Sequence, residues 1–212
     1  MTQENASKKK PELLIPASSL EVLKTAVLYG ADAVYIGGEA FSLRAKAKNF
    51  STEEMAEGIA FAHEHGVKVY VTANILAHNA DLAEAREYFA VLRDLEFTPA
   101  EADSDGEPKA PTPQSVPAQP DALIISDPGM FMIARKVWPD CEIHVSTQAN
   151  NTNYETYLFW WKLGAKRVVS ARELSLAEIR EIREHIPEEM EIESFIHGSM
   201  CISYSGRCLL SN

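Results

Sequence analysis

Tyr29-Gly30-Ala31-Asp32-Ala33-Val34 is the stretch that first indicates the fold, because its layout returns twice further along the chain. The later copies read His65-Gly66-Val67-Lys68-Val69 and Leu163-Gly164-Ala165-Lys166-Arg167-Val168. In each copy, a glycine of the kind that ends helices leads directly into an apolar run typical of a strand. A helix end followed at once by a strand, three times over, indicates repeated βα units.

Seven short runs rich in Val, Ile and Leu are expected to form strands, at residues 12–16, 33–38, 68–74, 122–127, 142–149, 167–172 and 192–198. Amphipathic segments between them are expected to form helices, at residues 20–29, 55–65, 81–95, 128–137, 153–163 and 176–186. Ser19, Ser51 and Ser175 stand where helix-capping serines are common. Strands that are apolar on both faces and alternate with helices predict a buried parallel sheet.

The sequence therefore predicts an α/β fold of the TIM-like (β/α) barrel type rather than a doubly wound nucleotide-binding sheet. No glycine-rich phosphate loop follows the first expected strand, where the sequence reads Ala17-Ser18-Ser19-Leu20. A complete barrel has eight strands and usually about 250 residues, whereas this chain offers about seven strands in 212 residues. We expect an incomplete barrel that is cut before its eighth strand.

Residues 97–120 interrupt the alternation of strands and helices. This segment holds six of the eleven prolines and four acidic residues, which predicts a disordered loop insertion. It separates a helix from the next strand, so we expect it on the barrel face away from the carboxyl ends of the strands. Both a spacer and a partner-binding role stay open. We expect a disordered tail at residues 1–10 and one barrel domain over residues 11–212, truncated at its carboxyl end.

The charge balance disfavours nonspecific binding to nucleic acids or anionic membranes. The chain has 20 Lys and Arg against 31 Asp and Glu, a net charge of -11. No apolar run is long enough to cross a membrane, and residues 1–10 do not resemble a signal peptide. We expect a cytoplasmic protein with no membrane partner. Three cysteines without an export signal are expected to be thiols or metal ligands, and Cys141 is expected in the core.

Polar side chains stand where the expected strands end, which is where barrel enzymes place their chemistry. Asp127 is equally well explained as the cap of the helix that begins at Pro128. Amides offer neutral donors and acceptors that suit a sugar, a base edge or a carboxylated small molecule, and cations suit phosphate or carboxylate. The candidate substrate-binding residues are Arg44, Lys46, Asn74, Gln148, Asn150 and Arg172, with Asn151 beside them.

Glu193, Phe195 and His197 share one face of the last expected strand. If that face points into the barrel, Glu193 must be paired or have a perturbed pKa. Glu193 and His197 are therefore the candidate catalytic residues. A structural ion pair for Glu193 and a polar contact at the barrel rim for His197 stay open as alternatives.

Cys201 and Cys208 lie seven residues apart on a glycine-containing loop just beyond that strand. Two thiols on one loop can converge on a metal, but they do not complete a four-cysteine zinc or iron–sulfur site. Metal binding and ordinary buried thiols are both compatible with this spacing.

Two neighbouring segments resemble the signature of the collagenase-like peptidase U32 family. They read Glu193-Ser-Phe-Ile-His-Gly-Ser-Met-Cys201 and Gly206-Arg-Cys-Leu-Leu-Ser211. Residues 11–17, 30–38, 42–46 and 146–150 also resemble the amino-terminal half of this family. The resemblance covers the chain except the tail before Pro11 and the loop at 97–120.

The resemblance implies an RNA-modifying enzyme. Family members hydroxylate the wobble uridine of bacterial tRNA to 5-hydroxyuridine, with prephenate as a linked metabolite, and others hydroxylate ribosomal RNA or act in oxygen-independent ubiquinone synthesis. It implies tRNA as the substrate and a [4Fe-4S] cluster, with Cys201 and Cys208 as the first two of four ligands. The other two ligands are then expected beyond Asn212. Ring hydroxylation needs redox chemistry that side chains lack, which also favours a cofactor.

Two alternatives remain beside RNA hydroxylation, which we rank first. The family name implies a collagenase-like peptidase, but the sequence has no His-Glu-x-x-His motif, and the only histidine near Cys201 is His197. Nothing in the sequence gives that pair an orienting third group or an oxyanion hole. A non-catalytic fragment or assembly module is the second alternative.

Overall fold

Seven parallel strands form one curved sheet at the centre of the molecule. The computed structural model describes residues 10–39, 41, 49–99, 114–198 and 203–205. The sheet has the order β1-β2-β3-β6-β7-β8-β9, and every neighbouring pair is parallel. The strands are β1 (Leu14–Pro16), β2 (Ala33–Gly37), β3 (Lys68–Ala73), β6 (Ala122–Ile125), β7 (Glu142–Val145), β8 (Arg167–Val169) and β9 (Glu191–Glu193).

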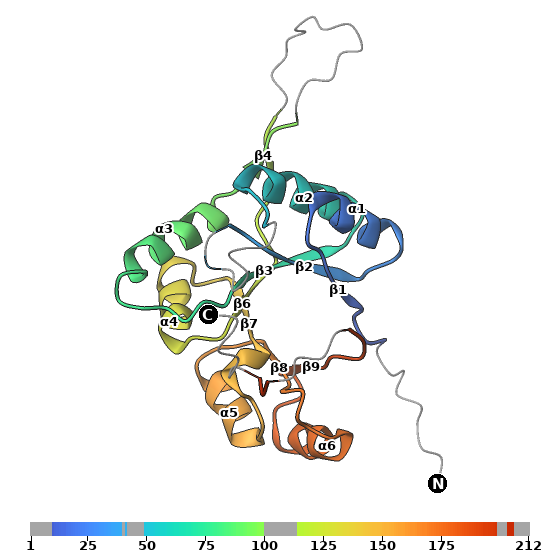
Figure 1. Cartoon of the computed structure of the whole chain (residues 1–212), viewed down its shortest axis with the longest axis vertical. Helices are drawn as coiled ribbons and strands as arrows, with labels where there is room; N and C mark the ends of the chain where they lie inside the picture. Colours follow the sequence, from blue (N-terminus) through green and yellow to red (C-terminus); the bar gives the residue numbers. More distant parts are fainter. Residues whose placement is uncertain (1–9, 40, 42–48, 100–113, 199–202, 206–212) are drawn as a thin grey trace, which may run out of the picture.

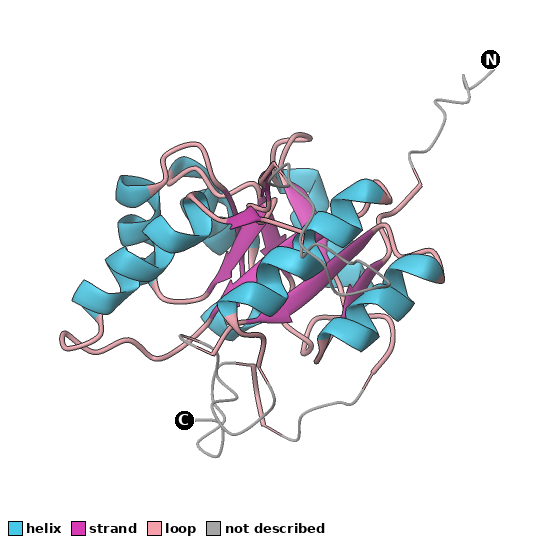
Figure 2. Cartoon of the chain, turned by 90° about the horizontal axis from the view of Figure 1, so that it is seen from above, coloured by secondary structure: helices cyan, strands magenta, loops and turns pink. Residues whose placement is uncertain are grey.

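Six α-helices of the described part lie along the convex side of this sheet (Figure 1). They are α1 (Leu20–Leu28), α2 (Thr52–Glu64), α3 (Leu82–Arg93), α4 (Pro128–Val137), α5 (Tyr154–Lys162) and α6 (Leu176–His185). The strands run side by side, and the helices flank them (Figure 2). This arrangement is an α/β half-barrel, so the predicted incomplete TIM-like barrel is confirmed.

Side-chain capping explains where most of these helices begin. The side chains of Ser19, Asp127 and Asn153 each accept a hydrogen bond from a backbone N–H in the first helical turn. Ser51 and Ser175 form complete capping boxes with Glu54 and Glu178. The cap explanation for Asp127 is thus confirmed.

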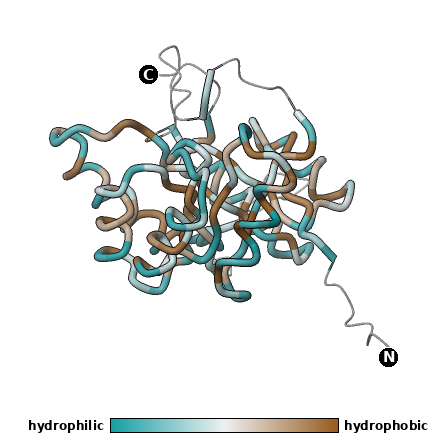
Figure 3. The backbone as a smooth tube through the Cα atoms, turned by 90° about the horizontal axis from the view of Figure 1, so that it is seen from below, coloured by the Kyte–Doolittle hydropathy of each residue, from teal (hydrophilic) through white to brown (hydrophobic). Residues whose placement is uncertain are grey.

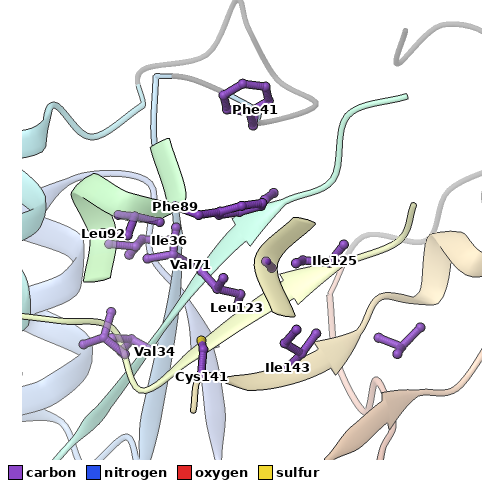
Figure 4. Close-up of a cluster of buried hydrophobic side chains, with 14 of the residues drawn as sticks. Val34, Ile36, Phe41, Val71, Phe89, Leu92, Leu123, Ile125, Cys141 and Ile143 are labelled. Carbon is purple, nitrogen blue, oxygen red and sulfur yellow. The ribbon is translucent and has the colours of Figure 1, made fainter. Parts of the chain in front are cut away.

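The main core lies between the sheet and the helices. Alternate strand residues, among them Val34, Val71 and Leu123, point outward and pack against helix residues such as Phe89 (Figure 4). Hydrophobic stretches of the backbone are concentrated toward the middle of the molecule (Figure 3). Cys141 is buried in this core as predicted, and burial raises the pKa of its thiol to about 12.

Several predicted strands are too long, among them 122–127, which ends at Ile125, and 167–172, which ends at Val169, and two others miss by four or five residues. The strand expected at 142–149 ends at Val145, because Ser146 caps a short 3-10 helix, η1 (Thr147–Ala149). The strand expected at 192–198 ends at Glu193, because its neighbour β8 already ends at Val169 and offers no further register. The face predicted to be shared by Glu193, Phe195 and His197 is therefore not a strand face.

The predicted insertion is narrower than 97–120 within the described residues. Its ends form an antiparallel ribbon of β4 (Glu96–Phe97) and β5 (Val116–Pro117), and Ser115 donates a hydrogen bond to the Glu96 carboxylate. Ala118, just after β5, is fully buried, and its N–H donates to the backbone oxygen of Leu95. The ribbon lies between α3 and β6, as predicted, whereas residues 100–113 and 1–9 lie outside the described residues.

No helix among the described residues is long and apolar enough to span a membrane.

Replacing Leu123 with Ala should lower the free energy of unfolding by about 2–5 kcal/mol, because a fully buried leucine leaves a cavity between β6 and the helices. Leu28→Ala is the matched control, since this leucine on α1 is 66% exposed and its loss should change the stability by about 0.5 kcal/mol or less. Urea unfolding of both variants checks this, and equal losses would contradict the assignment of the core.

Candidate active site

A cavity of ≈ 260 Å³ lies at the carboxyl ends of the strands. Residues at or just after the ends of six strands line it. They are Ala17, Gly37, Asn74, Ser146, Arg172 and Phe195. Parallel strands bring their carboxyl ends to one edge, so segments far apart in sequence converge on this cavity.

Four of the predicted site residues line the cavity, namely Asn74, Gln148, Arg172 and Glu193. Among the described lining residues, Arg172 is the only cation and Glu193 the only acid. The side-chain oxygen of Asn74 is buried and has no hydrogen-bond partner among the described residues. The described lining therefore combines apolar and neutral polar groups with one basic and one acidic side chain.

The other predicted residues lie elsewhere. Asn150 ends η1 in the left-handed conformation, with φ 56°, and is not among the described lining residues. His197 lies exposed beyond β9. Asn151 is fully buried and structural, because its side chain bonds Ser146, Val169 and Trp160. The remaining candidates lie outside the described residues, namely Arg44, Lys46, Cys201 and Cys208.

Beneath the cavity, Arg167 joins three carboxylates on the concave side of the sheet. Its guanidinium donates to Glu12 at 2.7 Å, to Glu191 at 2.6 Å and to Glu193 at 3.4 Å. The Arg167 side chain is only 8% exposed, and its guanidinium also lies over the Tyr70 ring. The Tyr70 hydroxyl in turn donates to Glu12. All of these groups except Tyr70 are charged, so the concave side is a paired ionic layer.

The ionic layer gives two of its carboxyl groups opposite pKa shifts. Burial dominates at Glu193 and raises its pKa, since Arg167 is at the longest of the three distances and the carboxylates of Glu12 and Glu191 repel it. Burial also acts on Glu12, but the guanidinium of Arg167 and the Tyr70 hydroxyl outweigh it and hold the pKa of Glu12 below its ordinary value. Glu193 therefore keeps its proton more easily than an exposed glutamate does.

His144 extends the layer onto β7. Burial lowers the pKa of this fully buried histidine, so the imidazole is neutral and its Nε2–H donates to Glu142 at 2.9 Å. That hydrogen bond lowers the pKa of Glu142. Glu12, His144 and Arg167 were not predicted as site residues, although each is a polar or charged residue within or next to a run of apolar strand residues.

No group of three or more His, Cys, Asp or Glu in the described part of the chain could hold a metal ion. Cys141, the described cysteine, is buried in the core. The two candidate ligands Cys201 and Cys208 are not in that part.

A family model for Peptidase family U32 matches residues 18–212. The chain belongs to peptidase family U32. It is 47% identical over 204 residues to tRNA hydroxylation protein P1 of Bacillus subtilis, covering 96% of this chain and 42% of that protein. It is 46% identical over 202 residues to tRNA hydroxylation protein P of Escherichia coli, covering 95% and 39%. This U32 chain thus spans about two fifths of the length of these relatives.

The fold of this U32 chain matches a solved family structure. The U32 peptidase Mk0906 superposes with a TM-score of 0.63 at 18% sequence identity, covering 92% of this chain and 72% of that chain. At this identity the match supports the fold alone, and it agrees with the half-barrel described above.

Glu193→Gln should become more stable relative to the wild type as pH rises above about 4.3. Because burial raises the pKa of Glu193, its stabilising contribution is complete below the unfolded glutamate pKa of about 4.3 and is lost as pH rises through the native pKa. A glutamine cannot ionise and avoids this loss. Urea unfolding at several pH values measures the difference.

Glu142→Gln is the control with the opposite sign. The hydrogen bond from His144 lowers the pKa of Glu142, so its contribution is present above the unfolded pKa and is lost as pH falls through the native one. The same pH dependence for both variants would contradict the assigned ionic layer.

Proposed function

We propose that this chain forms the substrate pocket of a tRNA hydroxylase that converts the wobble uridine to 5-hydroxyuridine. The observation that carries the proposal is the likeness to tRNA hydroxylation proteins of two bacteria, at 46–47% identity over almost the whole chain. Because the chain spans about two fifths of those proteins, the activity and the tRNA substrate are proposed rather than transferred. A tRNA substrate also supports a cytoplasmic location.

The cavity suits a uracil ring. Uracil presents one N–H donor at N3 between two carbonyl acceptors, and the buried, unpartnered oxygen of Asn74 is an acceptor that such a donor would satisfy. The Gln148 amide can donate to a carbonyl. Cytosine has no hydrogen at N3, so this arrangement would favour uridine over cytidine.

Glu193 is the proposed acid–base group. Converting the C5 hydrogen of uracil into a hydroxyl group is a two-electron oxidation, whose oxygen atom and oxidant would come from outside the described residues. The ionised form of Glu193 in the cavity wall would accept the proton that leaves C5. Arg167 cannot bind substrate, because it is engaged by three carboxylates, but it fixes the position of Glu193. His197, exposed just past the cavity residue Phe195, is proposed as a second acid–base group at the rim.

Prephenate is proposed as the linked metabolite. It is a dicarboxylate, and Arg172 is the cation that the described cavity lining offers to a carboxylate. Arg44, Lys46 and Asn150 are proposed as further substrate contacts on the family resemblance alone.

A [4Fe-4S] cluster is proposed with Cys201 and Cys208 as ligands, and its other ligands would come from outside this chain. This proposal also rests on the resemblance. When bound, such a cluster supplies the electron transfer that side chains lack.

The peptidase alternative lacks geometric support among the described residues. Cys141 is buried and its pKa is raised to about 12, so it is a poor nucleophile at neutral pH. A peptidase would need Cys201 as its nucleophile, and purified protein of natural length would then cleave gelatin and lose that activity on Cys201→Ala. A non-catalytic module would retain the fold without a cluster or either activity.

Deleting the gene should abolish 5-hydroxyuridine and its derivatives in tRNA, and the wild-type gene should restore them. The Asn74→Ala gene should restore at most about one tenth of the wild-type amount of 5-hydroxyuridine, because a buried hydrogen bond to the substrate is lost. The Glu193→Gln gene should also restore little 5-hydroxyuridine. Asn79→Ala, at an exposed position outside the cavity lining, is the matched control and should restore the wild-type level. Mass spectrometry of tRNA nucleosides measures each level, and unchanged levels in the deletion strain would refute the proposed function.

Cys201→Ala and Cys208→Ala should each reduce the iron and sulfide content of anaerobically purified protein of natural length. Cys141→Ala should retain both, since this thiol lies in the core. Equal iron and sulfide contents in all three variants would exclude the two loop cysteines as cluster ligands. A complete absence of iron from all of them would favour the non-catalytic module.

A further inference from the structure

Phe195 and Arg172 form a stacked pair in the wall of the cavity. The guanidinium carbon of Arg172 lies 4.9 Å from the centre of the Phe195 ring, and both side chains line the cavity. Phe195 follows β9 and Arg172 follows β8, so the pair joins two neighbouring strand ends. The phenylalanine is 44% exposed, so part of its ring surface stays open to a ligand of the cavity.

Arg172 is held in place from its other side. Its Nη1 lies 3.5 Å from the Ser205 hydroxyl, and Thr147 donates to the same hydroxyl at 3.2 Å. The Ser205 backbone N–H donates to the Glu173 carboxylate at 2.7 Å. Ser205 is consequently buried, whereas the adjacent Tyr204 is 73% exposed. These contacts fix the guanidinium, and the guanidinium fixes one face of the Phe195 ring.

We propose that an unpaired RNA base stacks on the open face of Phe195, with Arg172 covering the opposite face. This inference rests on the proposed function and identifies how the cavity would hold its pyrimidine. Bases of single-stranded RNA commonly stack on aromatic rings and on guanidinium planes, and this interaction does not depend on the phosphate backbone.

Charge supports stacking over phosphate binding as the source of affinity. The chain has a net charge of -11, and Arg172 is the only cation among the described residues that line the cavity. The Glu173 carboxylate follows Arg172 directly in the chain. Burial acts to raise its pKa, but the hydrogen bonds from Ser205 and from its own backbone, together with the charge of Arg172, outweigh burial and hold the pKa below its ordinary value. The Glu173 carboxylate would repel a phosphate group but not a neutral base.

The test is the affinity of the protein of natural length for a fluorescent anticodon stem-loop RNA with uridine at the wobble position. Phe195→Leu should weaken binding about tenfold, while Phe195→Trp should keep it within about threefold, because tryptophan retains a stacking surface. Phe159→Leu is the matched control, since this phenylalanine on α5 is 51% exposed and lies outside the cavity lining. Circular dichroism verifies that each variant is folded.

An RNA that lacks only the wobble base makes the test specific. If that base stacks on Phe195, its removal should weaken wild-type binding about tenfold and should weaken Phe195→Leu binding hardly at all. The proposal would be overturned if the affinity losses from Phe195→Leu and from removal of the wobble base multiplied when the two were combined. A Phe195→Leu affinity within twofold of the wild type would also overturn it. If the affinities show stacking but deletion of the gene leaves 5-hydroxyuridine unchanged, the stacking inference holds and the proposed function is refuted. If deletion abolishes 5-hydroxyuridine but the affinities show no stacking, the proposed function holds and the stacking inference is refuted.

Discussion

The ion pairs of Arg167 with three carboxylates are the interaction on which the concave side of the sheet depends. They connect Glu12, just before the first strand, with Glu191 and Glu193 on the last one, across an otherwise open sheet. Buried charges are tolerated only when paired, and an unpaired one costs on the order of several kcal/mol. The interior of this half-barrel is therefore ionic at its base, while its apolar core lies outside, under the helices.

This layer also sets the chemistry of the cavity above it. The guanidinium is shared unequally, so Glu12 is held ionised while Glu193, at the longest distance, retains a proton more easily. A carboxyl group with a raised pKa in a cavity wall is suited to proton exchange with a ligand. Neutral amides, one arginine and the exposed ring of Phe195 also line the cavity, among apolar side chains. These groups suit a flat, uncharged ring that forms hydrogen bonds. They suit peptide hydrolysis less well, because the described lining contains no cysteine nucleophile.

Local patterns were sufficient for most of the architecture. The helix stops at Gly30, Gly66 and Gly164 all adopt positive φ and lead into strands, as their sequence context indicated. Strand ends were less predictable, because a strand stops where its neighbour stops offering hydrogen bonds, as β9 does beside β8. Phe195 and His197 were accordingly assigned to a strand that ends at Glu193.

The sequence by itself determined the βα repeat, the capped helix starts and the family, because all of these depend on residues close together in the chain. The expectation of strands that are apolar on both faces was wrong for the concave face, where Arg167 pairs with three carboxylates. Only the tertiary structure decided which polar residues meet. Arg167 and Glu12 are 155 positions apart, and Thr147 and Ser205 are 58 apart, yet each pair is in hydrogen-bond contact. Asn151 and Gln148 are both amides on the same polar segment. Asn151 makes structural hydrogen bonds to Ser146 and Trp160, whereas Gln148 lines the cavity. Curvature of the parallel sheet brings distant strand ends together, and no local pattern encodes those pairings.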